Sequence, residues 1–374
     1  PNNTCLPETN VLKRLSLYNN QITNFLHSFC EYCGMLDYLY LHGNSIPSIP
    51  ADIGFPEVNV LRILHFSSNQ IEEIPECIFK NLSRLSIFYI NSNKLVRLPN
   101  NSCLPCDNNV MATLHFQHNK IPYIPKGFIK CMNHLNYLNI YGNRLKYTIP
   151  PEEYPVPNRL QHIHQPYNLI SGSLRENFLC VINMEYLTSV QLYNNKISGV
   201  PNNTGLTLPN MLTWLYLHNN LITFIPNSFF ANMTVLKYLY LQSNLLISLP
   251  DFCTDNVLLP NLLYLHLHRT NVHIFPNISC FKETLIFFSI GANYLREIPI
   301  TVFLYSNETI QTFQPMKLNI FQVHDNYIQN ISTDIFKFMP YLTELAVYSQ
   351  NLKYLADIGV FNSTLDKFMT SLPI

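Results

Sequence analysis

Leu212–Pro226 reads LTWLYLHNNLITFIP, and its pattern recurs about fourteen times along the chain. As far as Asn220, apolar residues alternate with polar or aromatic ones, which is the period of two that a β-strand requires. Beyond Asn220 the chain must turn, and Pro226 removes a backbone donor and disfavours a helix. The stretch therefore predicts a short strand, a turn and an irregular return. We number repeat positions from Leu212 as position 0, so Asn220 is at position 8 and Pro226 at position 14.

The asparagine at position 8 recurs at steps that are mostly 23–27 residues long. We call these residues the asparagine series: Asn20, Asn44, Asn69, Asn93, Asn119, Asn143, Asn168, Asn195, Asn220, Asn244, Asn293 and Asn326, with Thr270 and Gln350 at the two remaining places. A period in this range indicates stacked units that cannot bury their apolar faces alone. An inward asparagine needs partners, and the N–H and C=O groups of a tight turn supply them. We therefore interpret the series as structural.

The full pattern, LxxLxLxxNxIxxIPxxxFxxLxx, resembles the "typical" class of extracellular leucine-rich repeats, which is found in Toll-like receptors and many animal adhesion and matrix proteins. The resemblance covers Leu12 to about Phe361. It implies an α/β repeat solenoid of horseshoe shape, with one long parallel β-sheet on the concave face. The convex side is expected to be mostly irregular or 3-10, with little helix. The resemblance says little about function, because this fold serves many unrelated functions.

We divide the chain into residues 1–11, a short N-terminal edge segment, residues 12–364, a solenoid of about 14 repeats, and residues 365–374, the start of a further, incomplete repeat. Two places break the rhythm. Residues 148–174 carry five prolines, and Gln165 replaces a strand leucine, which should disturb the sheet locally. About nine extra residues near 305–315 are expected to form a surface loop.

No apolar run approaches eighteen residues and no basic-then-apolar leader opens the chain, so we expect neither a membrane span nor a signal peptide within it.

Composition points to an extracellular chain, either secreted or a cell-surface ectodomain. Only 12% of residues are charged and the formal net charge is +0, which argues against a nucleic-acid partner. Ten cysteines without a zinc-like cluster agree with an oxidising compartment. Nine N-x-[ST] sequons predict glycosylation outside the strand segments, at Asn2, Asn81, Asn100, Asn202, Asn232, Asn277, Asn307, Asn330 and Asn362.

Residues at equivalent positions of successive repeats should lie about 4.8 Å apart, which is near disulfide reach. The expected pairs are Cys77 with Cys103, Cys106 with Cys131, Cys253 with Cys280, and Cys5 with Cys30. Cys33 and Cys180 are left without a neighbour. The alternative is that these cysteines stay reduced and replace the core phenylalanine and leucine usual at their positions.

Side chains at positions 2, 4 and 6 of each repeat should point away from the core and form what we call the outer face of the sheet. Of forty-two such positions, twelve are tyrosine and nine are histidine, while only Arg14 and Glu344 are charged. β-Propensity explains the tyrosines well and the histidines poorly. Rings with polar tips are the side chains that binding surfaces use. The outer face is therefore the predicted binding surface.

The densest cluster of rings lies in three consecutive repeats, and we call it the ring patch. Its members are Trp214, Tyr216, His218, Tyr238, Tyr240, Tyr264, His266 and His268. A neutral surface rich in hydroxyl and imidazole groups suits a protein, peptide or glycan partner. Because histidine protonates near pH 6.5, we expect binding to depend on pH between roughly 5 and 7.5.

Nothing in the sequence predicts catalysis or a cofactor. Glycine is scarce, and no GxGxxG, P-loop, GxSxG or HExxH motif occurs. The histidine pairs His162/His164 and His266/His268 lack nearby carboxylates and are weak evidence for a metal site. The favoured function is a non-catalytic extracellular recognition or adhesion module. The alternative is a structural subunit of an extracellular homopolymeric or matrix assembly, joined by self-association through solenoid ends or lateral faces.

Overall fold

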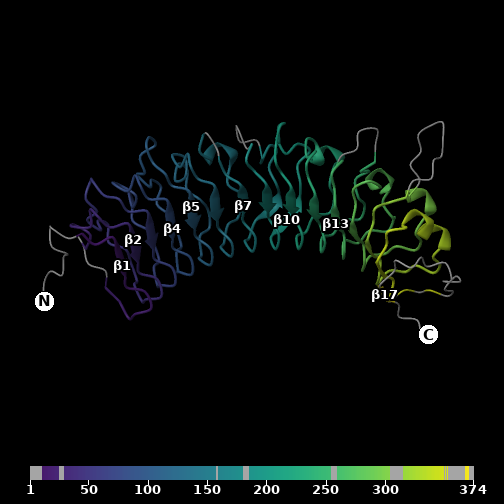
Figure 1. The fold of residues 1–374 in the computed structure, drawn as a ribbon, viewed down its shortest axis with the longest axis horizontal. Coiled ribbons are helices and arrows are strands. Elements are labelled where there is room, and N and C mark those ends of the chain that lie inside the picture. Colours follow the sequence, from purple (N-terminus) through teal and green to yellow (C-terminus); the bar gives the residue numbers. More distant parts are fainter. Residues whose placement is uncertain are drawn as a thin grey trace. The chain divides into compact units, whose positions relative to one another are not determined.

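The computed structural model describes residues 11–24, 29–156, 159–179, 185–253, 259–303, 315–348, 350, 352 and 367–369. Within those limits the chain forms two compact units. The first unit comprises Pro1–Ser171 and Phe178–Leu187, and the second comprises Gly172–Asn177 and Thr188–Ile374. Each unit is a stack of repeats, and successive repeats contribute neighbouring three-residue strands (Figure 1).

The strands of each unit are parallel and follow one another in chain order. The first unit contains β1 (Arg14–Ser16), β2 (Tyr38–Tyr40), β3 (Ile63–His65), β4 (Ile87–Tyr89), β5 (Thr113–His115), β6 (Tyr137–Asn139) and β7 (His162–His164). The second contains β9 (Ser189–Gln191), β11 (Trp214–Tyr216), β12 (Tyr238–Tyr240), β13 (Tyr264–His266), β14 (Phe287–Ser289), β15 (Ile320–Gln322), β16 (Glu344–Ala346) and β17 (Lys367–Met369). Equivalent repeat positions pair across strands, as Leu215 does with Leu239.

The return side of the repeats is irregular. It carries the short 3-10 helices η1 (Pro151–Glu153), η2 (Asn227–Phe230), η3 (Ser279–Phe281), η4 (Ile300–Phe303) and η5 (Thr333–Phe338). A separate two-stranded sheet joins β8 (Ser171–Ser173) and β10 (Lys196–Gly199). The described residues contain no α-helix, so the predicted solenoid with a parallel sheet and an irregular return side is confirmed. None of their helices has the length and apolar character needed to cross a membrane.

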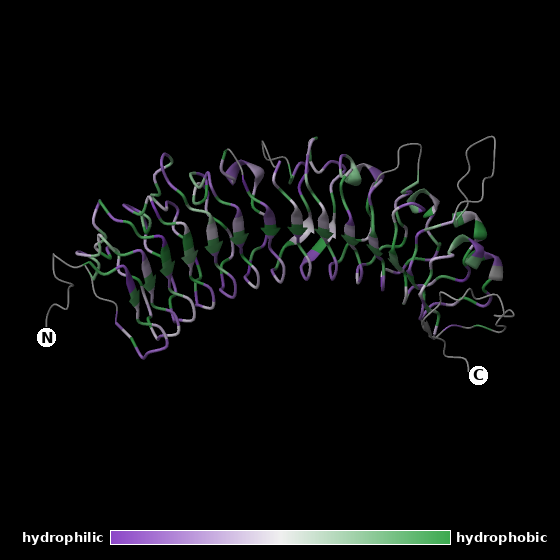
Figure 2. Cartoon of the chain, in the orientation of Figure 1, coloured by the Kyte–Doolittle hydropathy of each residue, from purple (hydrophilic) through white to green (hydrophobic). Residues whose placement is uncertain are grey.

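The core of each unit is built from the apolar positions of the repeat. Leu212, Leu215 and Leu217, at positions 0, 3 and 5, are fully buried. The strand residues between them are only half-buried, so apolar and more polar residues alternate along the strands (Figure 2). Phe229 and Phe230 of η2 fill the space behind the sheet, and their ring centroids lie 5.2 Å apart. This alternation sends the residues at positions 2, 4 and 6 to the outer face.

Most repeats are joined to the preceding one by an asparagine side chain. Asn220 is only 4% exposed, and its Nδ2 donates to the carbonyls of Leu192 (3.0 Å) and Leu217 (2.9 Å). Its Oδ1 accepts from the backbone N–H of Ile197 at 3.1 Å. Gln350 makes equivalent bonds to the preceding repeat, to Val323 O and from Ile328 N. These bonds satisfy turn groups that would otherwise be buried without partners.

The Asn220→Ala substitution should lower the free energy of unfolding by about 2–4 kcal/mol, because three buried backbone groups lose their partner. The matched control is Asn261→Ala, where one exposed amide donates to Thr234 O, and where the expected loss is under about 1 kcal/mol. Urea denaturation followed by circular dichroism measures both. Equal losses for the two variants would contradict the structural interpretation of the asparagine series.

Of the segments that we expected to be irregular, the structure describes most of residues 148–174. We expected residues 148–174 to disturb the sheet, yet β7 pairs with β6 in register, with Leu138 opposite Ile163. Pro166 follows the strand and uses only its carbonyl, which accepts from Gly142 N at 3.1 Å. Residues 1–10 and 304–314 lie outside the described residues, as do most of 365–374. The described part of that last segment, Lys367–Met369, forms β17 and pairs with β16.

Three disulfides join consecutive repeats on the return side. Their pairs and Cα–Cα distances are Cys77–Cys103 at 4.4 Å, Cys106–Cys131 at 4.4 Å and Cys253–Cys280 at 5.4 Å. The expected Cys5–Cys30 pair is absent, because Cys30 is a buried free thiol that hydrogen-bonds to the free thiol of Cys33. Burial raises the pKa of Cys30, and that hydrogen bond lowers the pKa of Cys33. Cys5 and Cys180 lie outside the described residues.

Peptide mapping without reduction should recover the three disulfide-linked pairs, while Cys30 and Cys33 should react with a thiol reagent only after denaturation. Their thiols are buried, so the folded chain protects them. Recovery of Cys77, Cys103, Cys106, Cys131, Cys253 and Cys280 as free thiols would contradict the pairing.

Candidate ligand-binding face

The eight residues of the ring patch come together on β11, β12 and β13 and on the residues just after these strands. Parallel pairing in register sets equivalent rings beside one another. Trp214 stacks on Tyr238 with ring centroids 3.5 Å apart, and Tyr216 stacks on Tyr240 at 4.6 Å. Tyr240 in turn stacks on His266 at 4.4 Å. All eight side chains are half-buried, so the rings are partly covered by their neighbours and partly open to solvent.

The stack continues beyond the residues that the sequence singled out. Tyr193 lies 4.5 Å from His218, and Phe287 lies 4.4 Å from His266. His268 meets His324 at 5.3 Å between ring centroids. Position 6 of the repeat between those two histidines is Gly291, where a Cβ atom would come within 2.8 Å of the His324 ring. Tyr193 and Phe287 were detectable as outward rings, whereas the meeting of two histidines over a glycine needed the structure.

The first unit carries a second series of stacked rings on its own outer face. It runs from Tyr18 through His42, His65 and Tyr89 to His115, with centroid separations of 4.7, 4.0, 4.6 and 4.5 Å. The predicted pair His162 and His164 lies on β7 of the same unit. Stacked aromatic pairs contribute about 0.5–1.5 kcal/mol each beyond the area that they bury. Both series therefore stabilise the sheet as well as forming its surface.

Stacking shields His218 and His266 from water and favours their neutral form. Burial lowers the pKa of His218 to about 4, and burial together with neighbouring histidines lowers the pKa of His266 to about 4. The pKa of His65 in the first unit falls to about 4 for the same reasons. The Nδ1 atom of His218 is buried and has no hydrogen-bond partner among the described residues. The pKa values of His218 and His266 therefore lie below the value near 6.5 from which we expected their charge change, and burial lowers the pKa of His268 as well.

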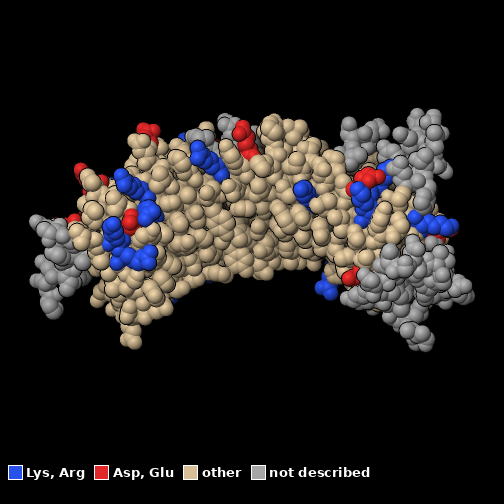
Figure 3. Space-filling model, viewed as in Figure 1, with Lys and Arg blue, Asp and Glu red and all other residues tan. Residues whose placement is uncertain are grey.

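Charged side chains are sparse on the face of each unit drawn in Figure 3. The two charged outer-face residues stand apart from the ring patch, and both have partners. The guanidinium of Arg14 lies 4.9 Å from the centre of the Tyr38 ring. Glu344 accepts a hydrogen bond from Gln322 at 3.1 Å. Burial raises the pKa of Tyr216 to about 12 and also raises the pKa of Tyr240, so these two hydroxyls stay protonated. The ring patch thus presents hydroxyl, imidazole and aromatic groups without charge.

Comparisons with known proteins agree with this architecture. Residues 210–272 match a family model described as leucine rich repeat, and residues 60–82 match a second model with the same description. The chain is a leucine-rich repeat protein. Domains of this kind are typically protein-binding modules and are generally non-catalytic. No curated protein is significantly similar to it in sequence.

Solved structures with the same fold come from distant organisms. A leucine-rich repeat protein of Leptospira interrogans superimposes with a TM-score of 0.62 at 19% identity, covering 91% of each chain. The plant peptide hormone receptor RGFR1 in complex with RGF2 gives 0.65 at 23% identity, and the Drosophila Toll–Spatzle complex gives 0.62 at 18%. Our chain is covered to 93% and 91% by these two, but spans only 53% and 42% of their chains. Identities this low show a shared fold alone.

The predicted glycosylation sites of this leucine-rich repeat protein differ in accessibility. Asn100, Asn202, Asn232, Asn277 and Asn330 are exposed. Asn81 is partly buried, and its Nδ2, the atom that would carry a glycan, donates to Phe55 O at 3.1 Å. The Nδ2 of Asn232 is also bonded, to Leu206 O at 2.8 Å. Asn2, Asn307 and Asn362 lie outside the described residues.

No group of three or more potential metal ligands occurs in the part of the chain that the structure describes.

Stability of this leucine-rich repeat protein should fall as pH decreases from about 6.5 to 4. The folded pKa values of His218 and His266 lie below their unfolded values, so the unfolded chain binds more protons in that window and is favoured. Above pH 6.5 this contribution is fully present. The change in Tm between pH 7 and pH 4.5 should shrink in the His218→Phe/His266→Phe variant, which keeps the rings and removes the titration.

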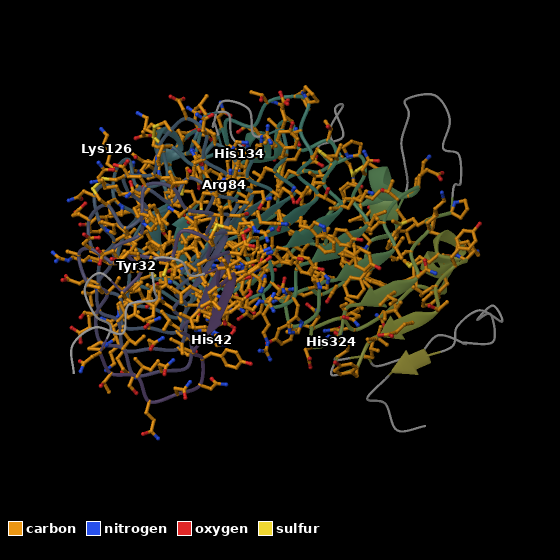
Figure 4. All side chains as sticks on the ribbon, turned by 60° about the vertical axis from the view of Figure 1, so that its left-hand side comes forward. Tyr32, His42, Arg84, Lys126, His134 and His324 are labelled. Atoms are coloured by element: carbon orange, nitrogen blue, oxygen red, sulfur yellow. A yellow bond between two sulfur atoms is a disulfide. The ribbon has the colours of Figure 1, made fainter. Side chains whose placement is uncertain are left out.

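The control for this measurement is His134→Phe in the first unit, an exposed histidine that lies on the other side of that unit from His42 (Figure 4). Differential scanning fluorimetry follows the three proteins in parallel. A pH dependence that is the same in all three would contradict the assignment of the effect to the stacked histidines.

Proposed function

We propose that this chain is the recognition domain of an extracellular protein and that it binds a neutral protein, peptide or glycan partner through the ring patch. The observation that carries the proposal is the stack of half-buried, uncharged rings on β11, β12 and β13. Stacking fixes the rings before a partner arrives, so little side-chain entropy remains to be lost on binding. Adhesion to a cell surface or matrix is one use of such a domain.

The extracellular setting has support of its own. Three disulfides join neighbouring repeats, and bonds of this kind persist in oxidising compartments. Five exposed sequon asparagines lie outside the strands, so glycans at these sites would leave the outer face uncovered. Two structures of similar fold are complexes of a receptor with RGF2 and of Toll with Spatzle. Those complexes make a peptide or protein the leading class of partner.

Binding should be lost in the Trp214→Ala/Tyr240→Ala variant, which removes two rings from different rows of the stack while leaving the core leucines intact. The probes are an array of oligosaccharides and a library of 15-residue peptides. The matched control is Tyr38→Ala/Tyr40→Ala, because β2 carries tyrosines at the same repeat positions in the first unit. Wild type and control should bind the same array members, each at least about 10-fold more tightly than the Trp214→Ala/Tyr240→Ala variant. Array members that bind both variants equally well would contradict the ring patch as the site.

A further inference from the structure

A strip of positive charge lies on the first unit, on the edge of the repeats that follows the asparagine turn. It occupies positions 9 to 12 of three successive repeats, and we call it the basic strip. Its members are Lys94, Arg97, Lys120, Arg144 and Lys146, all of them exposed. The same positions of these repeats contain no Asp or Glu. The formal net charge of +0 does not reveal the strip, because it averages over the whole chain.

Backbone hydrogen bonds arrange the basic strip as a row. The N–H of Lys120 donates to Leu95 O at 2.8 Å, and that of Arg144 donates to Ile121 O at 3.0 Å. The backbone of each cation at position 9 is thus held about one strand spacing, ~4.8 Å, from its equivalent in the next repeat. Like charges held at neighbouring places repel one another, so the row costs stability unless anions offset it.

One of the five cations is offset by a carboxylate of the chain. Arg97 donates from its Nε to Oε2 of Glu73, in the preceding repeat, at 2.9 Å. Glu72 of that repeat is also exposed, so the strip ends there beside an acidic pair. The other four cations form no ion pair among the described residues: Lys94, Lys120, Arg144 and Lys146. The uncompensated charge is therefore greatest in the two repeats that carry Lys120 and Arg144.

The repeat itself does not require charge at these positions. Position 9 is Ser45 and Gln70 in earlier repeats of the same unit, and it is Asn271 in a repeat of the second unit. Soluble surfaces usually intersperse both signs of charge. Three successive repeats that carry one sign depart from that rule, at a cost in repulsion. A negatively charged ligand would remove the cost by supplying the missing anions.

Two exposed tyrosines stand in the same repeats as the uncompensated cations. Tyr123 is 57% exposed and Tyr147 is 62% exposed, and both occupy position 12. Each therefore follows an exposed cation at position 9 of its own repeat, Lys120 or Arg144. A ring with a polar tip offers a large contact area at a low cost in side-chain entropy. Cations and exposed rings in the same repeats suit a ligand that carries both negative groups and flat apolar faces.

We propose that the basic strip binds a sulfated polysaccharide. Sulfate groups on successive sugars lie against Lys94, Lys120 and Arg144, and the sugar rings contact Tyr123 and Tyr147. The cations form charge-assisted hydrogen bonds with sulfate oxygens. An acidic peptide offers carboxylates but no flat sugar faces for the tyrosines. The choice of a glycan over a nucleic acid rests on the proposed extracellular setting, whereas the site itself is independent of the ring patch.

The test measures the binding of a heparin hexasaccharide to the intact chain by isothermal titration calorimetry, at about 0.15 M and about 0.5 M salt. Affinity should fall at the higher salt, because salt screens exposed charges. The Lys120→Gln/Arg144→Gln variant should bind at least about 10-fold more weakly than wild type at the lower salt. The matched control is Lys126→Gln/Lys130→Gln, which removes two exposed charges from the return side of the same unit and should bind normally.

Two further variants separate this site from the alternatives. Tyr123→Ala/Tyr147→Ala should weaken hexasaccharide binding at least about 3-fold, because the sugar rings lose their contacts. Trp214→Ala/Tyr240→Ala should bind the hexasaccharide as wild type does, so the failure of either proposal is distinguishable from the failure of the other. Thermal unfolding shows that each variant is folded.

Three results would overturn the proposal. One is the absence of saturable hexasaccharide binding at the lower salt. Another is equal weakening in Lys120→Gln/Arg144→Gln and Lys126→Gln/Lys130→Gln, which would show that total charge rather than the strip controls binding. The third is tighter binding of a polyglutamate peptide or of single-stranded DNA than of the hexasaccharide, which would assign the strip to that class of partner.

Discussion

The structure depends on hydrogen bonds that a buried asparagine makes between one turn and the next. Strands of three residues offer too few backbone bonds to hold a sheet together by themselves. Asn220 compensates by linking Leu217 of its own repeat to Leu192 and Ile197 of the preceding one. Because the same bonds recur at Asn93 in the first unit, equivalent residues of successive repeats are held in register in both units.

Register has a direct consequence for the outer face. Rings at equivalent positions are brought within stacking distance, as Trp214 and Tyr238 are at 3.5 Å. Stacking shields the rings from water, which makes charging a histidine costly and keeps His218 neutral down to about pH 4. The absence of charge on this face is therefore a product of packing as well as of composition. A surface so fixed and so neutral is suited to a partner that is read by its shape and hydrogen-bonding groups rather than by its charge.

Much of this architecture could be predicted from the sequence, because position in a repeat translates directly into position in space. The buried leucines, the asparagine series and the membership of the ring patch all follow from counting residues. The protonation state of the histidines does not follow from their position in a repeat. We expected titration near pH 6.5, whereas burial by stacking lowers the pKa of His218 and of His266 to about 4. The predicted partner of Cys30 was wrong because the pairing compared cysteines in neighbouring repeats, whereas Cys33, to which Cys30 hydrogen-bonds, belongs to the same repeat.

Trp214 is the only tryptophan of the chain, so its fluorescence reports on the ring patch alone. The most direct measurement is a titration of the chain with any peptide or glycan that the arrays identify, following Trp214 emission and its quenching by acrylamide. A partner that covers the ring patch should shift the emission to shorter wavelength and reduce quenching in proportion to the bound fraction. Unchanged emission and quenching at saturation would contradict recognition through this face.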